Sequence, residues 1–340
     1  MPKGSGGPRF TMKRMAAIAG TWLLLTAPAA TLAQSPEKRV HIGILVGGSL
    51  AQRGHLEQAL LEGLREQGYV EGKNLVLERR YADSNNEQTP VFARELAAMK
   101  LDAVVTTCTP TTRAAQQALG SMPIVMAAVA DPVGQHLIAS LARPGANITG
   151  LSSQAEDIMP KMLELFASVL PRPVTVAVLA DARSDTHPRM WQVLVPVAQT
   201  LKIKLVKIEV GRPAEAALTA AFETAVRETA GAVLVLPDEP MFLVQRTSIV
   251  ALAARHGLPA FYGAREFVDD GGLMSYGENL RVAYRHAASY ISQVARGANP
   301  GELPVQQPTR FELVINMKTA RSLGIAVPRS VLLGADAVIE

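Results

Sequence analysis

The chain has 340 residues, 48% of them hydrophobic, which is enough to bury the cores of about two domains. This composition excludes a collagen-like, disordered or low-complexity protein. Its 34 basic and 30 acidic residues form no basic patch, so we expect no nucleic-acid partner.

The first segment of the chain is typical of a secretory signal. Lys13 and Arg14 precede an apolar run, residues 15–29, and small residues follow at the positions that a signal peptidase reads. This pattern predicts a signal peptide over residues 1–33 and a mature N-terminus at Gln34. The apolar run is too short to span a membrane comfortably, which disfavours an anchor. We therefore expect an exported protein.

Removal of that segment changes the charge balance. It takes away four of the 34 basic residues and none of the acidic ones, which leaves 30 of each sign. The mature chain is thus formally neutral. Its only cysteine, Cys108, excludes an intrachain disulfide and a cysteine-based metal site, and the six histidines lack ligand spacing. We expect no metal and no cofactor.

In chain order, the first half alternates short apolar runs with helical stripes. Residues 40–46 are β-branched, as in a strand, and residues 56–67 carry an apolar stripe at helical spacing that Gly68 ends. The pattern continues with strands predicted at 75–78, 103–106 and 124–126, helices at 91–99 and 111–119, and one more helix after the turn at Asp131-Pro132.

The second half repeats this plan. It predicts strands at 174–179, 204–210, 232–236 and 259–262, and helices at 188–200, 213–227 and 241–256. Strands that alternate with helices form parallel sheets covered on both faces. Two such sets predict an α/β protein with two Rossmann-like lobes.

Three segments rich in Pro and Gly are candidate crossings between the lobes: residues 143–150, 271–272 and 304–308. Three crossings make each lobe discontinuous in sequence. The predicted boundaries are 39–150 with 274–306 for the first lobe, and 151–273 with 307–340 for the second.

Ligands of parallel sheets lie beyond the carboxyl ends of the strands, so the residues there are candidates for binding. Hydroxyls and helix N-termini can hold a carboxylate, acids can pair with an ammonium group, and tyrosine rings offer flat apolar faces. The candidate ligand-binding residues are Ser49, Thr109, Thr111, Asp131, Ser152, Asp238, Tyr262, Glu266 and Tyr276.

These candidates favour a zwitterion with an apolar group, such as an aromatic or branched amino acid. A purine or another neutral heterocycle stays open as the ligand. The candidates also have structural interpretations, because Thr109 and Thr111 can cap a helix, Asp131 can form a turn and Tyr276 can pack.

Nothing in the sequence indicates an enzyme. Cys108 precedes a predicted helix N-terminus, where a thiolate is favoured, but no histidine is placed to act as its base. No dinucleotide fingerprint, Walker motif or metal cluster is present. We therefore expect binding without catalysis.

Six motifs resemble the family of ABC-transporter substrate-binding proteins that includes the tryptophan-binding lipoproteins. Together they run along nearly the whole mature chain. They are Gly-Tyr-Val-Glu-Gly-Lys-Asn at 68–74, Asp-Pro-Val-Gly at 131–134, the run 141–150 that ends in Asn-Ile-Thr-Gly, Gly-Gly-Leu-Met-Ser-Tyr-Gly at 271–277, the run 303–309, and Leu-Val-Ile-Asn at 313–316.

The resemblance implies a periplasmic-binding-protein (Venus-flytrap) fold with three crossings, a small-molecule ligand in the interlobe cleft and delivery to an ABC permease in the inner membrane. Two departures stand out. Cys108-Thr109 replaces the usual Gly-Thr, and the lipoprotein cysteine is absent, which implies a free periplasmic protein. We also expect a monomer. The alternative is a sensor that reports its ligand to a membrane receptor kinase.

Overall fold

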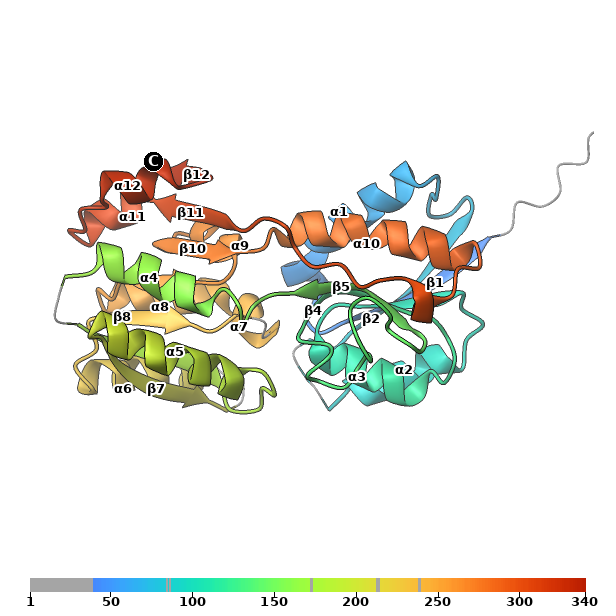
Figure 1. The fold of residues 1–340 in the computed structure, drawn as a ribbon, viewed down its shortest axis with the longest axis horizontal. Helices are drawn as coiled ribbons and strands as arrows, with labels where there is room; N and C mark the ends of the chain where they lie inside the picture. Colours follow the sequence, from blue (N-terminus) through green and yellow to red (C-terminus); the bar gives the residue numbers. More distant parts are fainter. Residues whose placement is uncertain (1–38, 84, 86, 172–173, 212–214, 238–239) are drawn as a thin grey trace, which may run out of the picture. The chain divides into compact units, whose positions relative to one another are not determined.

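The computed structural model describes residues 39–340 except 84, 86, 172–173, 212–214 and 238–239. The described residues form two α/β lobes, each built on one sheet (Figure 1). The predicted fold class is confirmed. The predicted signal peptide, residues 1–33, lies outside the described part of the chain.

The first lobe holds a fully parallel sheet in the order β2-β1-β3-β4-β5. Its strands are β1 (Val40–Val46), β2 (Leu75–Tyr81), β3 (Ala103–Thr106), β4 (Ile124–Ala130) and β5 (Ile148–Ser153). One face is covered by α1 (Leu50–Glu66) and α10 (Leu280–Ala295), which run side by side, and the other by α2 (Thr89–Ala97) and α3 (Thr109–Ala118) (Figure 1). Both faces are apolar because helices bury both.

The second lobe holds a sheet in the order β12-β11-β10-β9-β8-β6-β7, parallel except between β10 and β11. Its strands are β6 (Thr175–Asp181), β7 (Lys204–Val210), β8 (Ala232–Val235), β9 (Ala260–Tyr262), β10 (Met274–Gly277), β11 (Glu312–Asn316) and β12 (Ala337–Ile339). Its helices are α4 (Met159–Val169), α5 (His187–Leu201), α6 (Glu215–Arg227), α7 (Pro240–Val244), α8 (Arg246–Arg255), α9 (Arg265–Asp269), α11 (Met317–Ser322) and α12 (Arg329–Leu333), and a 3₁₀ turn, η1 (Pro300–Glu302), lies in the first lobe.

Two buried clusters form the core of the second lobe, one on each face of its sheet. Phe166 of α4 and Leu194 of α5 pack on one face. Phe222 of α6 and Ile249 of α8 pack on the other. Helices therefore cover both faces of the sheet, and the ends of its strands stay uncovered.

The chain crosses between the sheets three times, as predicted, but two crossings lie later than expected. β5 pairs with β4 as far as Ser153, and β10 pairs with β9 of the second sheet. The first crossing therefore follows Ser153 rather than residue 150, and the second follows Gly277 rather than residue 273.

The physical reason is the role of Gly150. It has a φ of +122°, and a Cβ there would lie 2.3 Å from the Met126 carbonyl oxygen. This glycine permits a close approach of two strands instead of marking a hinge.

Two other predictions are corrected. Residues 131–147, all of them described, form turns with no helix, and the first of these turns is closed by the Gln135 N–H, which donates to the Asp131 carbonyl at 2.9 Å. The helix predicted at 241–256 is divided at Gln245 into α7 and α8.

Candidate functional site

A cavity of about 770 Å³, including its open mouth, lies between the carboxyl ends of the two sheets. The strand order reverses between β1 and β3 in the first sheet and between β6 and β8 in the second. Such switch points form crevices in open α/β sheets. The lining comes from both lobes: Arg53, Thr107, Cys108, Ala128, Ser153, Leu280 and Tyr284 from the first, and Gln154, Ala155, Ile158, Val235, Leu236, Pro237, Phe242, Leu243, Gly263, Ala264, Phe267 and Phe311 from the second, with Glu278 in the crossing.

The start of α3 shapes one wall of the cavity. The buried hydroxyl oxygen of Thr111 accepts hydrogen bonds from the N–H groups of Thr107 and Cys108, each at 3.1 Å, and donates to the Cys108 carbonyl at 2.9 Å. Thr111 therefore holds the loop, and its hydroxyl does not line the cavity. The hydroxyl of Thr109 is buried without a hydrogen-bond partner among the described residues, and it too stands outside the lining.

Aromatic side chains form part of the apolar lining. Phe242, Phe267, Phe311 and Tyr284 contribute to it. The predicted Tyr262 lies behind this wall, fully buried, with its ring stacked on Phe267 at a centroid distance of 4.5 Å and an interplanar angle of 9°.

The predicted Tyr276 has a similar position. Its ring centroid lies 5.8 Å from that of Phe311. Phe311 lines the cavity, whereas Tyr276 does not. The sequence candidates were residues close to the strand ends, and no phenylalanine was among them. Phe242 of α7 and Phe267 of α9 lie beyond the ends of β8 and β9 and line the cavity.

Among the described residues, Arg53 and Glu278 are the charged residues of the lining, and neither was a sequence candidate. Arg53 lies one turn into α1 and is 7% exposed. One guanidinium nitrogen lies 3.4 Å from the Tyr284 hydroxyl, and Nε has no partner in the described part of the chain. Glu278 lies between β10 and α10, and burial raises its pKa from 4.5 to about 7.

Asp131 and Ser152 line a second hollow of about 610 Å³ at the rim between the lobes. The Asp131 carboxylate accepts from the Gly134 N–H at 2.8 Å and pairs with Arg189 of α5. The Ser152 hydroxyl donates to the Ser153 carbonyl at 3.0 Å. Asp131 thus connects the lobes as part of a turn and an ion pair.

Ser49 and Glu266 lie outside both linings. Ser49 is the N-cap of α1, where its N–H donates to the Gln52 side chain at 3.1 Å. The Glu266 carboxylate of α9 meets His55 of α1 at 3.3 Å, a second contact between the lobes. Burial raises the pKa of Glu266, but the His55 hydrogen bond contributes to a net lowering. Asp238, the remaining candidate, lies outside the described residues.

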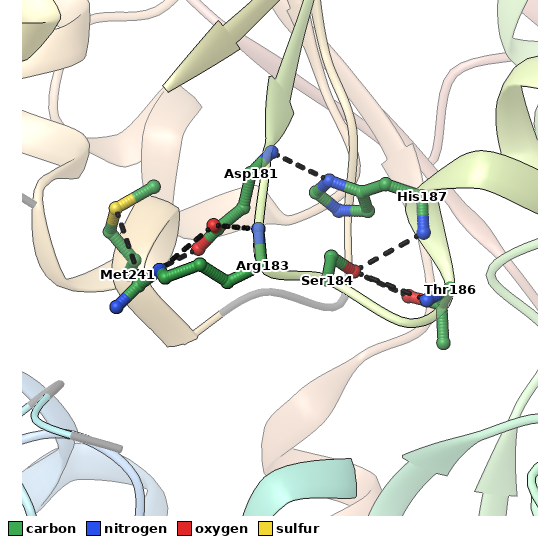
Figure 2. A network of polar contacts seen from close by, with 6 residues as sticks. All are labelled: Asp181, Arg183, Ser184, Thr186, His187 and Met241. Carbon is green, nitrogen blue, oxygen red and sulfur yellow. Dashed lines mark hydrogen bonds and ion pairs between the residues drawn. The ribbon is translucent and has the colours of Figure 1, made fainter. Parts of the chain in front are cut away.

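A buried histidine holds the wall of the second lobe (Figure 2). The Asp181 N–H donates to Nδ1 of His187 at 2.8 Å, and Nε2 donates to the Pro237 carbonyl at 2.9 Å. Because Nδ1 must accept and Nε2 must donate, the ring is neutral with its proton on Nε2. Burial accordingly lowers its pKa to about 4.

This ring also stacks on Phe242, with centroids 5.9 Å apart and an interplanar angle of 14°. His187 therefore ties the end of β6 to two parts of the cavity lining, Pro237 and Phe242. Beside it, the Asp181 carboxylate binds the Arg183 guanidinium at 2.9 Å (Figure 2).

In the described part of the chain, no three His, Cys, Asp or Glu side chains lie close enough together to hold a metal ion. Within the same residues, no helix combines the length and hydropathy needed to span a bilayer.

Comparison with known proteins gives one family and several relatives. Residues 42–339 match the family model described as ABC transporter substrate binding protein. A curated "Tyrosine-binding protein" of Clostridioides difficile (strain R20291) is 24% identical over 292 residues, which cover 84% of this chain and 81% of the relative.

Two solved structures share the fold. A conserved domain protein from Vibrio cholerae is 29% identical with a TM-score of 0.79, covering 89% of this chain and 99% of the other. An ABC domain from Streptococcus pneumoniae in complex with L-Trp is 25% identical with a TM-score of 0.80, covering 89% and 100%.

Proposed function

Because the chain belongs to the family of ABC transporter substrate-binding proteins, we propose that it captures an aromatic amino acid for import. The observation that carries this proposal is the cavity at both switch points. Phe242, Phe267 and Phe311 line it together with a buried arginine, Arg53. Aromatic rings provide a large apolar contact for a flat side chain, and a few charged groups orient the ligand. We propose binding without catalysis, in line with the family's role in substrate binding.

Two relatives support this class of ligand. One carries the name of a tyrosine-binding protein, and another was solved in complex with L-Trp. Both span most of this chain, so the cavity of this protein corresponds to a region that they contain. We therefore propose that the lining residues of this cavity bind a ligand of the same class.

A thermal-shift panel tests the proposal on protein stripped of ligand by unfolding and refolding. Amino acids, sugars and nucleosides are compared at equal concentration. An aromatic amino acid at about a hundred times its Kd is expected to add roughly 2.7 kcal/mol of stability. A shift by a sugar or nucleoside alone would contradict the proposal.

We also propose that the protein is exported to the periplasm and delivers its ligand to an ABC permease. The support is the signal pattern of residues 1–33 and the family's role. N-terminal sequencing of periplasmic material should find Gln34 first. A mature chain that still carries the apolar run would refute cleavage at this site.

A further inference from the structure

We infer that Arg53 and Glu278 recognise the two charges of the amino-acid ligand, Arg53 its carboxylate and Glu278 its ammonium group. This inference rests on the proposed function and names the residues that read the ligand's backbone.

Arg53 is a buried cation that no described acid contacts. Its side chain lines the cavity, and no carboxylate of the described residues lies within ion-pair distance of it. The nearby acids have other partners. Glu57 pairs with Arg79, and Glu266 binds His55. Arg53 interacts with Glu266 only electrostatically, at longer range. A buried charge without a partner is costly, and a ligand carboxylate would supply the missing bidentate contact.

Glu278 is the corresponding acid. It lines the same cavity, and none of the described Lys, Arg or His side chains lies within ion-pair distance of it. The next residue, Asn279, fixes the backbone, because its Oδ1 accepts from the Val282 N–H at 3.1 Å and its Nδ2 donates to Glu312 at 2.8 Å. An ammonium group in the cavity would favour the ionised carboxylate.

Arg53 and Glu278 line one cavity without pairing with each other. Arg53 comes from α1 of the first lobe, and Glu278 from the crossing between β10 and α10. Two opposite charges on the wall of an apolar cavity fit a molecule that carries both charges itself. The rings of Phe242, Phe267 and Phe311 leave the remaining wall apolar for an aromatic side chain.

The test is calorimetric titration of the variants Arg53→Gln and Glu278→Gln with three probes: L-tryptophan, tryptamine without the carboxylate, and indole-3-propionate without the ammonium group. Arg53→Gln should weaken L-tryptophan roughly 10- to 100-fold and leave tryptamine unchanged. Glu278→Gln should weaken L-tryptophan similarly and leave indole-3-propionate unchanged. Arg53→Lys, which keeps the charge but not the planar fork, should recover part of the loss.

Exposed residues supply the controls. Arg65→Gln on the same helix and Glu302→Gln in η1 should bind all three probes as the wild type does. If the wild type binds none of the probes and no aromatic amino acid stabilises it in the thermal-shift panel, the proposed function fails, and the charge assignment with it. If the wild type binds L-tryptophan but each variant weakens all probes equally, or binds like the wild type, only the charge assignment is overturned.

Discussion

At the scale of the residue, His187 shows how a buried titratable group supports the cavity without facing it. Its pKa is lowered by burial to about 4, against 6.5 in an unfolded chain. The folded state therefore excludes a proton that the unfolded state takes up, so stability should fall as the pH drops from 6.5 to 4, by at most roughly 3 kcal/mol.

Thermal melts from pH 4 to pH 8 measure this effect. His187→Gln should remove most of this loss of stability. Between pH 4 and pH 6.5, the melting temperature of the variant should therefore rise less with pH than that of the wild type. A variant with an unchanged slope would show that His187 is not the group responsible. The variant should also weaken ligand binding, because the Pro237 carbonyl and Phe242 lose their support.

Glu278 has the opposite dependence. Burial raises its pKa from 4.5 to about 7, so the folded state holds a proton that the unfolded state has released. Its contribution to stability is present below pH 4.5 and is lost as the pH rises to 7. Glu278→Gln should remove this loss, so its stability should rise relative to the wild type across that window.

The ligand offers an independent measurement. If an ammonium group binds beside Glu278, binding at pH 6.5 should release a proton. Calorimetry in buffers of different ionisation enthalpy detects that release, and Glu278→Gln should abolish it. Equal enthalpies in all buffers for the wild type would contradict the prediction.

At the scale of the element, α3 depends on one hydroxyl at its N-terminus. Thr111→Val removes the acceptor of the Thr107 and Cys108 N–H groups and leaves two buried donors unpaired. We expect a loss of about 1–3 kcal/mol of stability by chemical denaturation, with the wild-type value restored in Thr111→Ser. Wild-type stability in Thr111→Val would mean that these bonds are not formed in solution.

At the scale of the whole molecule, ion pairs join the lobes at the rim of the cavity. Arg189 of α5 pairs with Asp131 of the first lobe. Its side chain is 49% exposed, so Arg189→Ala should weaken ligand binding by less than about fivefold, and less at high salt. Ligand binding should close the two lobes on the cavity, so small-angle scattering of this variant with saturating ligand should show a smaller radius of gyration than without ligand.

Arg265→Ala is the matched control. Arg265 is similarly exposed and pairs with Asp269 within a single helix of the second lobe. Removal of that pair should leave affinity unchanged. An equal effect of the two variants would show that the Arg189 pair does not act on the lobes.

The sequence by itself determined the two α/β lobes, the three crossings and the alternation of strands and helices, because these depend on local hydrophobic period and turn residues. It also predicted a candidate site at the strand ends, the region where the cavity lies. Strand β1 and strand β7 lie at the predicted residues.

Only the tertiary structure decided which side chains line the cavity. Tyr262 and Phe267 are five residues apart, and their rings are stacked. Packing between the strand and the following helix places Phe267 in the cavity lining and Tyr262 behind it. Arg53 and Glu278 are far apart in sequence, and no local pattern relates them. They line one cavity because the chain returns through β10 to α10, which packs against α1, and that contact is a property of the fold rather than of any segment.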